Sequence, residues 1–280
     1  MELADVLALP FFRVAALAAL VLAGIHAYLG FHVVRRGVLF VDLALAQMAA
    51  LGVALSVVLD LEHHGFLSYL LALGMTFVGA ALFAWLRGRA RNVPLEAFIG
   101  IVFATAQAAV FLVLEKSPAG PEHLKETLVG SLFTIEPGHL ATVAGLYGAV
   151  GIVHFLVRRP FFEITSDPEG AARRGRRLFL WDFFFYATFG LVVTSSVQMA
   201  GVLLVFGYLV IPAVAGLLAS PRTGVALAVG WVFGVAGSLL GLLGSVQFDL
   251  PAAPSILVTL TVMLAALGAV LGLRRRGRAR

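Results

Sequence analysis

Apolar runs of about 20 residues follow one another along this chain, separated by short charged or Gly/Pro-containing stretches. A helix that crosses a bilayer needs about 20 mostly apolar residues. The spans predicted by these runs cover residues 11–34, 38–58, 66–86, 94–114, 139–157, 178–196, 200–219, 223–245 and 254–273. The composition agrees, since 61% of the residues are hydrophobic and 12% are charged, against about a quarter charged in soluble domains. We therefore predict an all-α polytopic membrane protein with about nine transmembrane helices, in a single transmembrane domain over residues 1–280.

Basic residues gather in alternate loops. Of the 20 Lys and Arg, all but Arg13, Lys116 and Lys125 lie in loops that share one side if the N-terminus is outside. The positive-inside rule therefore predicts an N-out, C-in topology. The net charge of +5 follows from this loop pattern, and no nucleic-acid binding is expected. The basic tail, residues 274–280, is expected to lie against anionic membrane lipid.

Two connections are long enough to have structure of their own. The inner one, residues 158–177, contains Asp167, Pro168 and Glu169, the sequence of an N-cap, a first-turn proline and a first-turn acid. Gly175 would end this helix of about two turns, which is either an ordered loop or a docking element. The outer connection ends in the apolar segment 127–135, which is too short to span and is predicted to be re-entrant or interfacial.

Polar residues inside the predicted spans are costly, and they often mark a transport path. Asp42 and Gln47 lie in the second span, Glu96 in the fourth and His26 in the first, and we take these four as candidates for a translocation path. Asp42 lies near basic residues and could reach an interface, whereas Gln47 lies at mid-span.

Each of the other intramembrane polar residues has a structural alternative. Glu96 and Asp182 lie near inner ends of spans and could pair with Arg91 and Arg177. His26 and His154 could pair with the acids or serve only as packing residues.

One outer loop carries metal-compatible side chains, and its alternative is a solvated loop. These candidate ligands are Asp60, Glu62, His63 and His64. Glycines spaced by three or four residues in the eighth span predict close helix packing, either within the chain or at a homodimer seam. They are Gly230, Gly234, Gly237, Gly241 and Gly244.

Catalytic motifs are missing from the sequence. It has no G-x-S-x-G, no H-E-x-x-H and no Gly-Lys pair, so it has no P-loop. An intramembrane enzyme would need a base beside Ser195 or Ser196, and no partner is evident. We therefore expect a non-enzyme, and any ATP that powers it must be hydrolysed by another subunit.

Four segments together resemble one family. They are "RRGVLFVDLALAQMAALGVAL" (35–55), "NVPLEAFIGIVFA" (92–104), "FEITSDPEGAARRG" (162–175) and "MAGVLLVFGYLVIPAVAGLLA" (199–219). In this order they resemble the permease subunit of the manganese/zinc/iron-type ABC importers, and the similarity runs over roughly residues 11–273.

The resemblance implies a fold of the metal/cobalamin-importer type in the bacterial inner membrane. It also implies a homodimer, two cytoplasmic ATPase subunits that bind ATP, and a periplasmic or lipoprotein substrate-binding protein. The cargo would be a divalent metal ion, with no cofactor bound permanently. The residues implied to contact the ATPase, within the coupling segment 158–177, are Asp167, Pro168, Glu169, Ala172 and Gly175.

The second span departs from the family pattern Gly-Asp-Ala-Leu-Ser/Ala-His. Gln47 stands at the position of the histidine, Leu43 at that of the aspartate and Asp42 at that of the glycine. Asp42 and Gln47 are five residues apart, about 140° around a regular helix, so they cannot chelate one ion there. They remain the candidate metal contacts, but the cargo could differ or pass without firm binding. A non-transporting scaffold for an ATPase is the other alternative.

Overall fold

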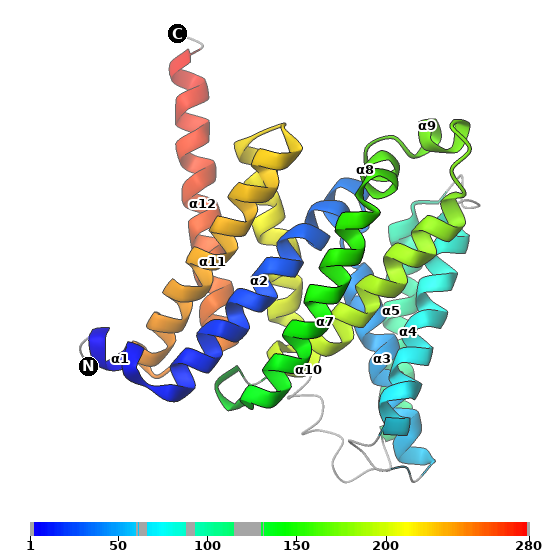
Figure 1. Ribbon diagram of the computed structural model, residues 1–280, viewed down its shortest axis with the longest axis horizontal. Helices are drawn as coiled ribbons and strands as arrows, with labels where there is room; N and C mark the ends of the chain where they lie inside the picture. Colours follow the sequence, from blue (N-terminus) through cyan, green and yellow to red (C-terminus); the bar gives the residue numbers. More distant parts are fainter. Residues whose placement is uncertain are drawn as a thin grey trace. The chain divides into compact units, whose positions relative to one another are not determined.

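The computed structural model describes residues 3–59, 61, 66–87, 93–114, 130 and 132–278, and within these residues every regular element is a helix. Figure 1 shows the helices along the chain. Their bounds are α1 (Leu3–Ala8), α2 (Pro10–Arg36), α3 (Val41–Val58), α4 (Phe66–Arg87), α5 (Leu95–Leu114), the 3₁₀ turn η1 (Leu132–Thr134), α7 (Pro137–Leu156), α8 (Arg158–Ser166), α9 (Pro168–Arg173), α10 (Leu178–Ala219), α11 (Thr223–Phe248) and α12 (Ala252–Arg278).

Eight of the described helices are long and apolar enough to cross a membrane. One of them, α10, has 42 residues and is interrupted at Gly201, whose φ of 75° and ψ of 157° are not helical. It therefore holds two of the predicted spans, 178–196 and 200–219. The predicted all-helical membrane fold is confirmed, whereas the number of crossings and the N-out orientation stay predictions.

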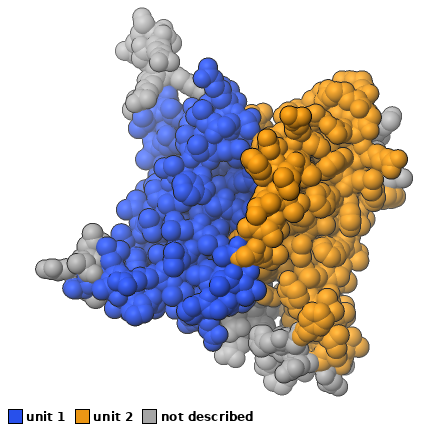
Figure 2. Space-filling model, viewed as in Figure 1, with its two compact units in different colours: residues 1–34, 129–144, 199–280 blue, residues 35–128, 145–198 orange. Residues whose placement is uncertain are grey.

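The chain divides into two compact units built from interleaved segments (Figure 2). Unit 1 comprises residues 1–34, 129–144 and 199–280, and unit 2 comprises residues 35–128 and 145–198. The single permease domain over residues 1–280 stays a prediction.

In unit 1, small residues let helices approach closely. Gly241 of α11 lies against the backbone of Ile256 in α12, and Gly30 of α2 lies against the backbone of Leu209 in α10. Gly230 lies beside the backbone of Pro212. These contacts fit the intramolecular reading of the glycine stripe, although a side chain at Gly244 would meet open space.

The outer segment 127–135 is described at residue 130 and from residue 132 onward. Gly130 has a φ of +64°, and a side chain there would collide with the backbone of Ala200 and Gly201, at the break in α10. Glycine is therefore required at position 130 both for its backbone conformation and for space. The re-entrant placement of this segment stays a prediction.

In unit 2, α3 packs against both α4 and α5. Gly52 of α3 lies against the backbone of Leu71 and Ala72, so the two helices approach without an intervening side chain. The hydroxyl oxygens of Ser56 and Ser68 are 2.8 Å apart at the same contact. This packing fixes α3, the helix that carries Asp42 and Gln47.

Candidate functional site

The first turn of α3 carries a buried acid. Phe40 is the N-cap residue and Asp42 is the second residue of the helix, with only 1% of its surface exposed. A carboxylate in a first turn is favoured by the helix dipole and by the unpaired backbone N–H groups there. Among the described residues, none makes a hydrogen bond to the buried Oδ1 atom of Asp42.

Glu96 lies at the same end of α3. It is in the first turn of α5, and its Oε1 atom accepts a hydrogen bond from the backbone N–H of Phe40 at 3.3 Å. The structure therefore places Glu96 beside Phe40, two residues before Asp42 in the chain. The proposed alternative for Glu96, a pair with Arg91, lies outside the described residues.

The other two path candidates lie elsewhere. Gln47 is buried within α3 with 7% of its surface exposed, five residues after Asp42 and so on a different side of the helix. His26 belongs to unit 1, where its Nδ1 donates a hydrogen bond to the carbonyl of Leu22 at 2.7 Å. The assignment of all four residues to one path stays a prediction.

The outer-loop metal candidates Asp60, Glu62, His63 and His64 lie outside the described residues. Within the described part of the chain, no group of three or more His, Cys, Asp or Glu side chains is placed to hold a metal ion. The predicted contacts Asp42 and Gln47 therefore stand as separate polar groups along α3.

The capped helix predicted in the inner connection is confirmed as α9. The Asp167 side chain accepts a hydrogen bond from the backbone N–H of Gly170 at 2.8 Å, with Pro168 in the first turn. At the other end, Gly175 has a φ of +84°. Its N–H donates to the carbonyl of Ala172, and the N–H of Arg176 donates to that of Ala171. This is a Schellman motif, which glycine at this position favours.

One face of α9 points to solvent. The side chains of Glu169 and Arg173 are 88% and 74% exposed and lie 3.9 Å apart. Gly170 and Ala171 are buried on the other face, while Ala172 is exposed. The buried face of α9 thus packs against the protein, and its opposite face presents a small charged surface.

A helix that we did not predict, α8, precedes α9. Phe161, Ile164 and Thr165 are its buried residues, with the spacing of one helical face. The same spacing in the sequence could have predicted this amphipathic helix. On its outer side, Arg176 Nε donates a hydrogen bond to Glu163 Oε2 at 2.9 Å. This bond, helped by the nearby positive charges of Arg176, Arg174 and Arg159, lowers the pKa of the Glu163 carboxyl.

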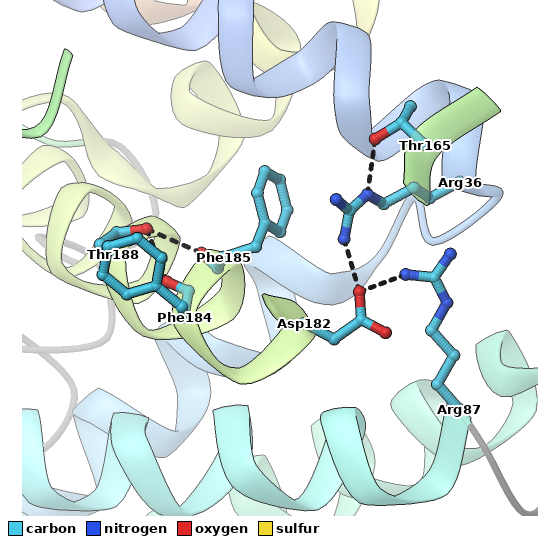
Figure 3. Close-up of polar contacts among 7 residues, drawn as sticks. All are labelled: Arg36, Arg87, Thr165, Asp182, Phe184, Phe185 and Thr188. Carbon is cyan, nitrogen blue, oxygen red and sulfur yellow. Dashed lines mark hydrogen bonds and ion pairs between the residues drawn. The ribbon is translucent and has the colours of Figure 1, made fainter. Parts of the chain in front are cut away.

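A buried charge cluster of unit 2 residues lies where the ends of α2, α4, α8 and α10 meet (Figure 3). Asp182 Oδ1 accepts a hydrogen bond from Arg36 Nη1 at 2.9 Å and another from Arg87 Nη1 at 2.5 Å. Arg36 Nε also donates to the Thr165 hydroxyl at 3.0 Å. The Arg36 guanidinium lies over the Phe185 ring, 4.1 Å from its centroid. We call Arg36, Arg87, Thr165, Asp182 and Phe185 the arginine cluster.

The arginine cluster corrects our interpretation of Asp182. We expected this acid at the interface near Arg177, but its side chain is 1% exposed and its partners are Arg36, with 0% exposure, and Arg87, with 16%. The partners lie 146 and 95 residues from it in sequence, so no local pattern could identify them.

The remaining intramembrane candidates have hydroxyl and carbonyl partners. His154 Nε2 lies 2.8 Å from the Thr188 hydroxyl. Ser196 is hydrogen-bonded to the Tyr147 hydroxyl, and the Ser195 hydroxyl lies 3.3 Å from the same group. The side-chain partner of both serines is therefore a tyrosine.

Comparisons with known proteins bear on this arrangement. Over 251 residues the chain is 24% identical to the manganese transport system membrane protein MntC of Halalkalibacterium halodurans, covering 89% of this chain and 84% of that protein. It is 23% identical to the manganese import system permease protein ScaB of Streptococcus gordonii, covering 89% and 87%.

The fold is also similar to a solved structure. A chain of PsaBC from Streptococcus pneumoniae, in complex with Fab, superposes with a TM-score of 0.79 at 19% identity, covering 95% of each chain. The sequence model of the ABC 3 transport family matches residues 8–270, nearly the whole chain. The resemblance carried by the four motifs is thereby confirmed, and this polytopic membrane protein belongs to the ABC 3 transport family.

Proposed function

We propose that this chain is the membrane-spanning permease subunit of an ATP-driven importer in the bacterial inner membrane. Its cargo is a divalent transition metal ion of the manganese, zinc and iron class, delivered by a periplasmic or lipoprotein binding protein. Two copies form the pore. The family supports this proposal, as do the relatives named as manganese transport proteins.

The observation that carries the proposal is the geometry of α9. It is a six-residue helix fixed by caps at both ends, with Glu169 and Arg173 directed to solvent. A helix that is capped at both ends is rigid enough to transmit a movement of a bound partner. Its exposed charges can form specific hydrogen bonds and ion pairs with that partner. We assign this surface to a cytoplasmic ABC ATPase, in keeping with the family.

The cargo would pass the polar residues of α3 without a chelate. Asp42 offers a buried carboxylate at the start of the helix, and Gln47 offers an amide more than one turn further along. A buried amide with no hydrogen bond costs about 1–3 kcal/mol, which favours a wet or polar surrounding for Gln47. Glu96 lies next to the α3 N-terminus.

A permease of the same family that carries a different cargo is a second candidate function. Leu43 and Gln47 stand at the two positions where typical members have an aspartate and a histidine, so the usual pair of transition-metal ligands is missing. An amide is a weaker ligand than an imidazole for such ions. This substitution favours either a harder cation or a cargo other than a bare ion.

The test uses the permease reconstituted in vesicles with its ATPase and binding protein. Metal content and ATP-dependent uptake of Mn²⁺, Zn²⁺ and Fe²⁺ are measured for wild type, Gln47→Leu and the double variant Leu43→Asp/Gln47→His. We expect Gln47→Leu to slow uptake and the double variant to retain more metal. Normal uptake by Gln47→Leu, with no metal gained by the double variant, would contradict the path assignment. Uptake of none of the three ions would favour the second cargo or the scaffold.

A further inference from the structure

We propose that Arg36 is a positioning residue that links the coupling helices α8 and α9 to α3. Its guanidinium is bonded to Thr165 at the end of α8, and its backbone leads directly into the helix that carries Asp42 and Gln47. This inference deepens the proposed function and rests on it for the role of α9.

The first link is between α9 and Arg36. Thr165 lies in the last turn of α8, 6% exposed, two residues before Asp167, the N-cap of α9. Arg36 Nε donates to its hydroxyl at 3.0 Å. Because Thr165 and the α9 cap are separated by a single residue, a displacement of α9 must move the Thr165 hydroxyl, and with it one partner of the guanidinium.

The second link is between Arg36 and α3. Arg36 is the last residue of α2, Gly37 turns the chain with a φ of +66°, and α3 begins at Val41. The connection is tight, since the Val41 N–H donates to the Val38 carbonyl at 3.2 Å and Val38 is 2% exposed. A four-residue connection that is turned by Gly37 and anchored by the buried Val38 has little slack. A shift of Arg36 is therefore passed to the first turn of α3, where Asp42 and the Glu96–Phe40 contact lie.

The third link holds the guanidinium in place. Asp182 of α10 accepts from both Arg36 and Arg87, and Phe185 lies beneath the Arg36 guanidinium. Little water screens these charges, so the bonds are stronger than a surface ion pair. Arg36 is thus held by Asp182 and Phe185 of α10, and its bond to Thr165 of α8 lets it follow the coupling helices.

The Thr165 hydroxyl is the member of this linkage that can be removed without unpairing a charge. In Thr165→Val the ion pairs with Asp182 are kept and the hydroxyl that accepts from Arg36 is removed. Thr165→Ser restores the hydroxyl. Thr188→Val is a matched control, because it removes another buried threonine hydroxyl of unit 2, one that lies 2.8 Å from His154 Nε2. That hydroxyl bonds to the backbone carbonyls of Phe184 and Phe185 (Figure 3) and not to Arg36.

The experiment measures ATP hydrolysed per Mn²⁺ transported by the reconstituted complex of permease, ATPase and binding protein. We expect Thr165→Val to bind the ATPase normally but to use several-fold more ATP per ion. Thr165→Ser and Thr188→Val should keep the wild-type ratio. A wild-type ratio in Thr165→Val, or an equal loss in Thr188→Val, would overturn the proposal.

A second readout does not depend on transport. Amide hydrogen exchange is followed in the purified permease at residues 37–42, with and without the ATPase. We expect ATPase binding to slow this exchange in wild type and Thr165→Ser but not in Thr165→Val. If wild type transports no metal yet shows this pattern, the proposed cargo fails and the linkage stands. If the ATPase slows exchange equally in Thr165→Val, the linkage is wrong whatever the cargo.

Discussion

Two regions of unit 2 each pair an arginine with a carboxylate, one in a buried setting and the other in an exposed one. The Arg36 and Asp182 side chains are 0% and 1% exposed, whereas those of Arg173 and Glu169 on α9 are 74% and 88% exposed. A buried pair is held by its surroundings and is costly to break, while an exposed pair contributes little to stability. The arginine cluster therefore stabilises unit 2, whereas the exposed charges of α9 are those that we propose a partner recognises.

The largest effect is expected from Asp182→Ala. It would leave the guanidinium groups of Arg36 and Arg87 without their shared carboxylate, and breaking a buried pair typically costs about 3–5 kcal/mol. The thermal unfolding midpoint of the purified permease should fall clearly. Glu169→Ala is the matched surface control and should change the midpoint little. Equal stability of the two variants would remove the distinction between the regions.

The next effect concerns binding and not stability. The double variant Glu169→Arg/Arg173→Glu reverses both exposed charges of α9 and keeps the net charge. We expect an unchanged unfolding midpoint and at least a tenfold loss of ATPase affinity, which corresponds to about 1.4 kcal/mol. Co-purification and titration with the ATPase measure this. Normal ATPase binding would show that α9 is not the docking surface.

A smaller effect is expected at the α9 cap. Asp167→Ala removes the side-chain acceptor of the Gly170 N–H, and loss of such a cap costs about 1 kcal/mol. Amide exchange in residues 168–173 should become faster, and ATPase affinity should fall less than in the charge reversal. Asp167→Asn retains an acceptor and should behave almost as wild type. If alanine and asparagine have the same effect, the cap does not order α9.

The smallest effect is a pH dependence. The bond from Arg176 lowers the pKa of Glu163, so the contact stabilises the α8–α9 region above the ordinary carboxyl pKa of 4.5 and is lost as the pH falls through the lowered value. Exchange of amides 163–176, corrected for its intrinsic pH dependence, should rise on acidification below that range. The variant Glu163→Gln should lack this rise in amide exchange on acidification. A rise of equal size in that variant would show that another carboxyl group causes the pH dependence.

The fold class, the helical ranges and the cap at Asp167 could be predicted from the sequence because each depends on local patterns. Apolar run length defines a span, and the order Asp-Pro-Glu defines a helix start. The break at Gly201 lies at the second residue of the predicted run 200–219, close to where we had separated it from the run 178–196. In these cases the information is contained in one short segment.

The arginine cluster could not be predicted in the same way. Arg36 follows the predicted span 11–34, and only the fold brings it to Asp182 and Thr165, 146 and 129 residues away. The start of α3 was similarly uncertain. With the helix beginning at Val41, Asp42 lies in its first turn instead of deeper inside. Its neighbour Glu96 comes from another helix.

ATP-dependent Mn²⁺ uptake into vesicles that contain the permease, its ATPase and its binding protein tests the central claim most directly. The account predicts uptake that requires ATP, and its loss when the charges of Glu169 and Arg173 are reversed although the permease stays folded. ATP-dependent uptake that survives this reversal would contradict the coupling role of α9. Absence of uptake by wild type for Mn²⁺, Zn²⁺ and Fe²⁺ alike would contradict the proposed import of a transition metal.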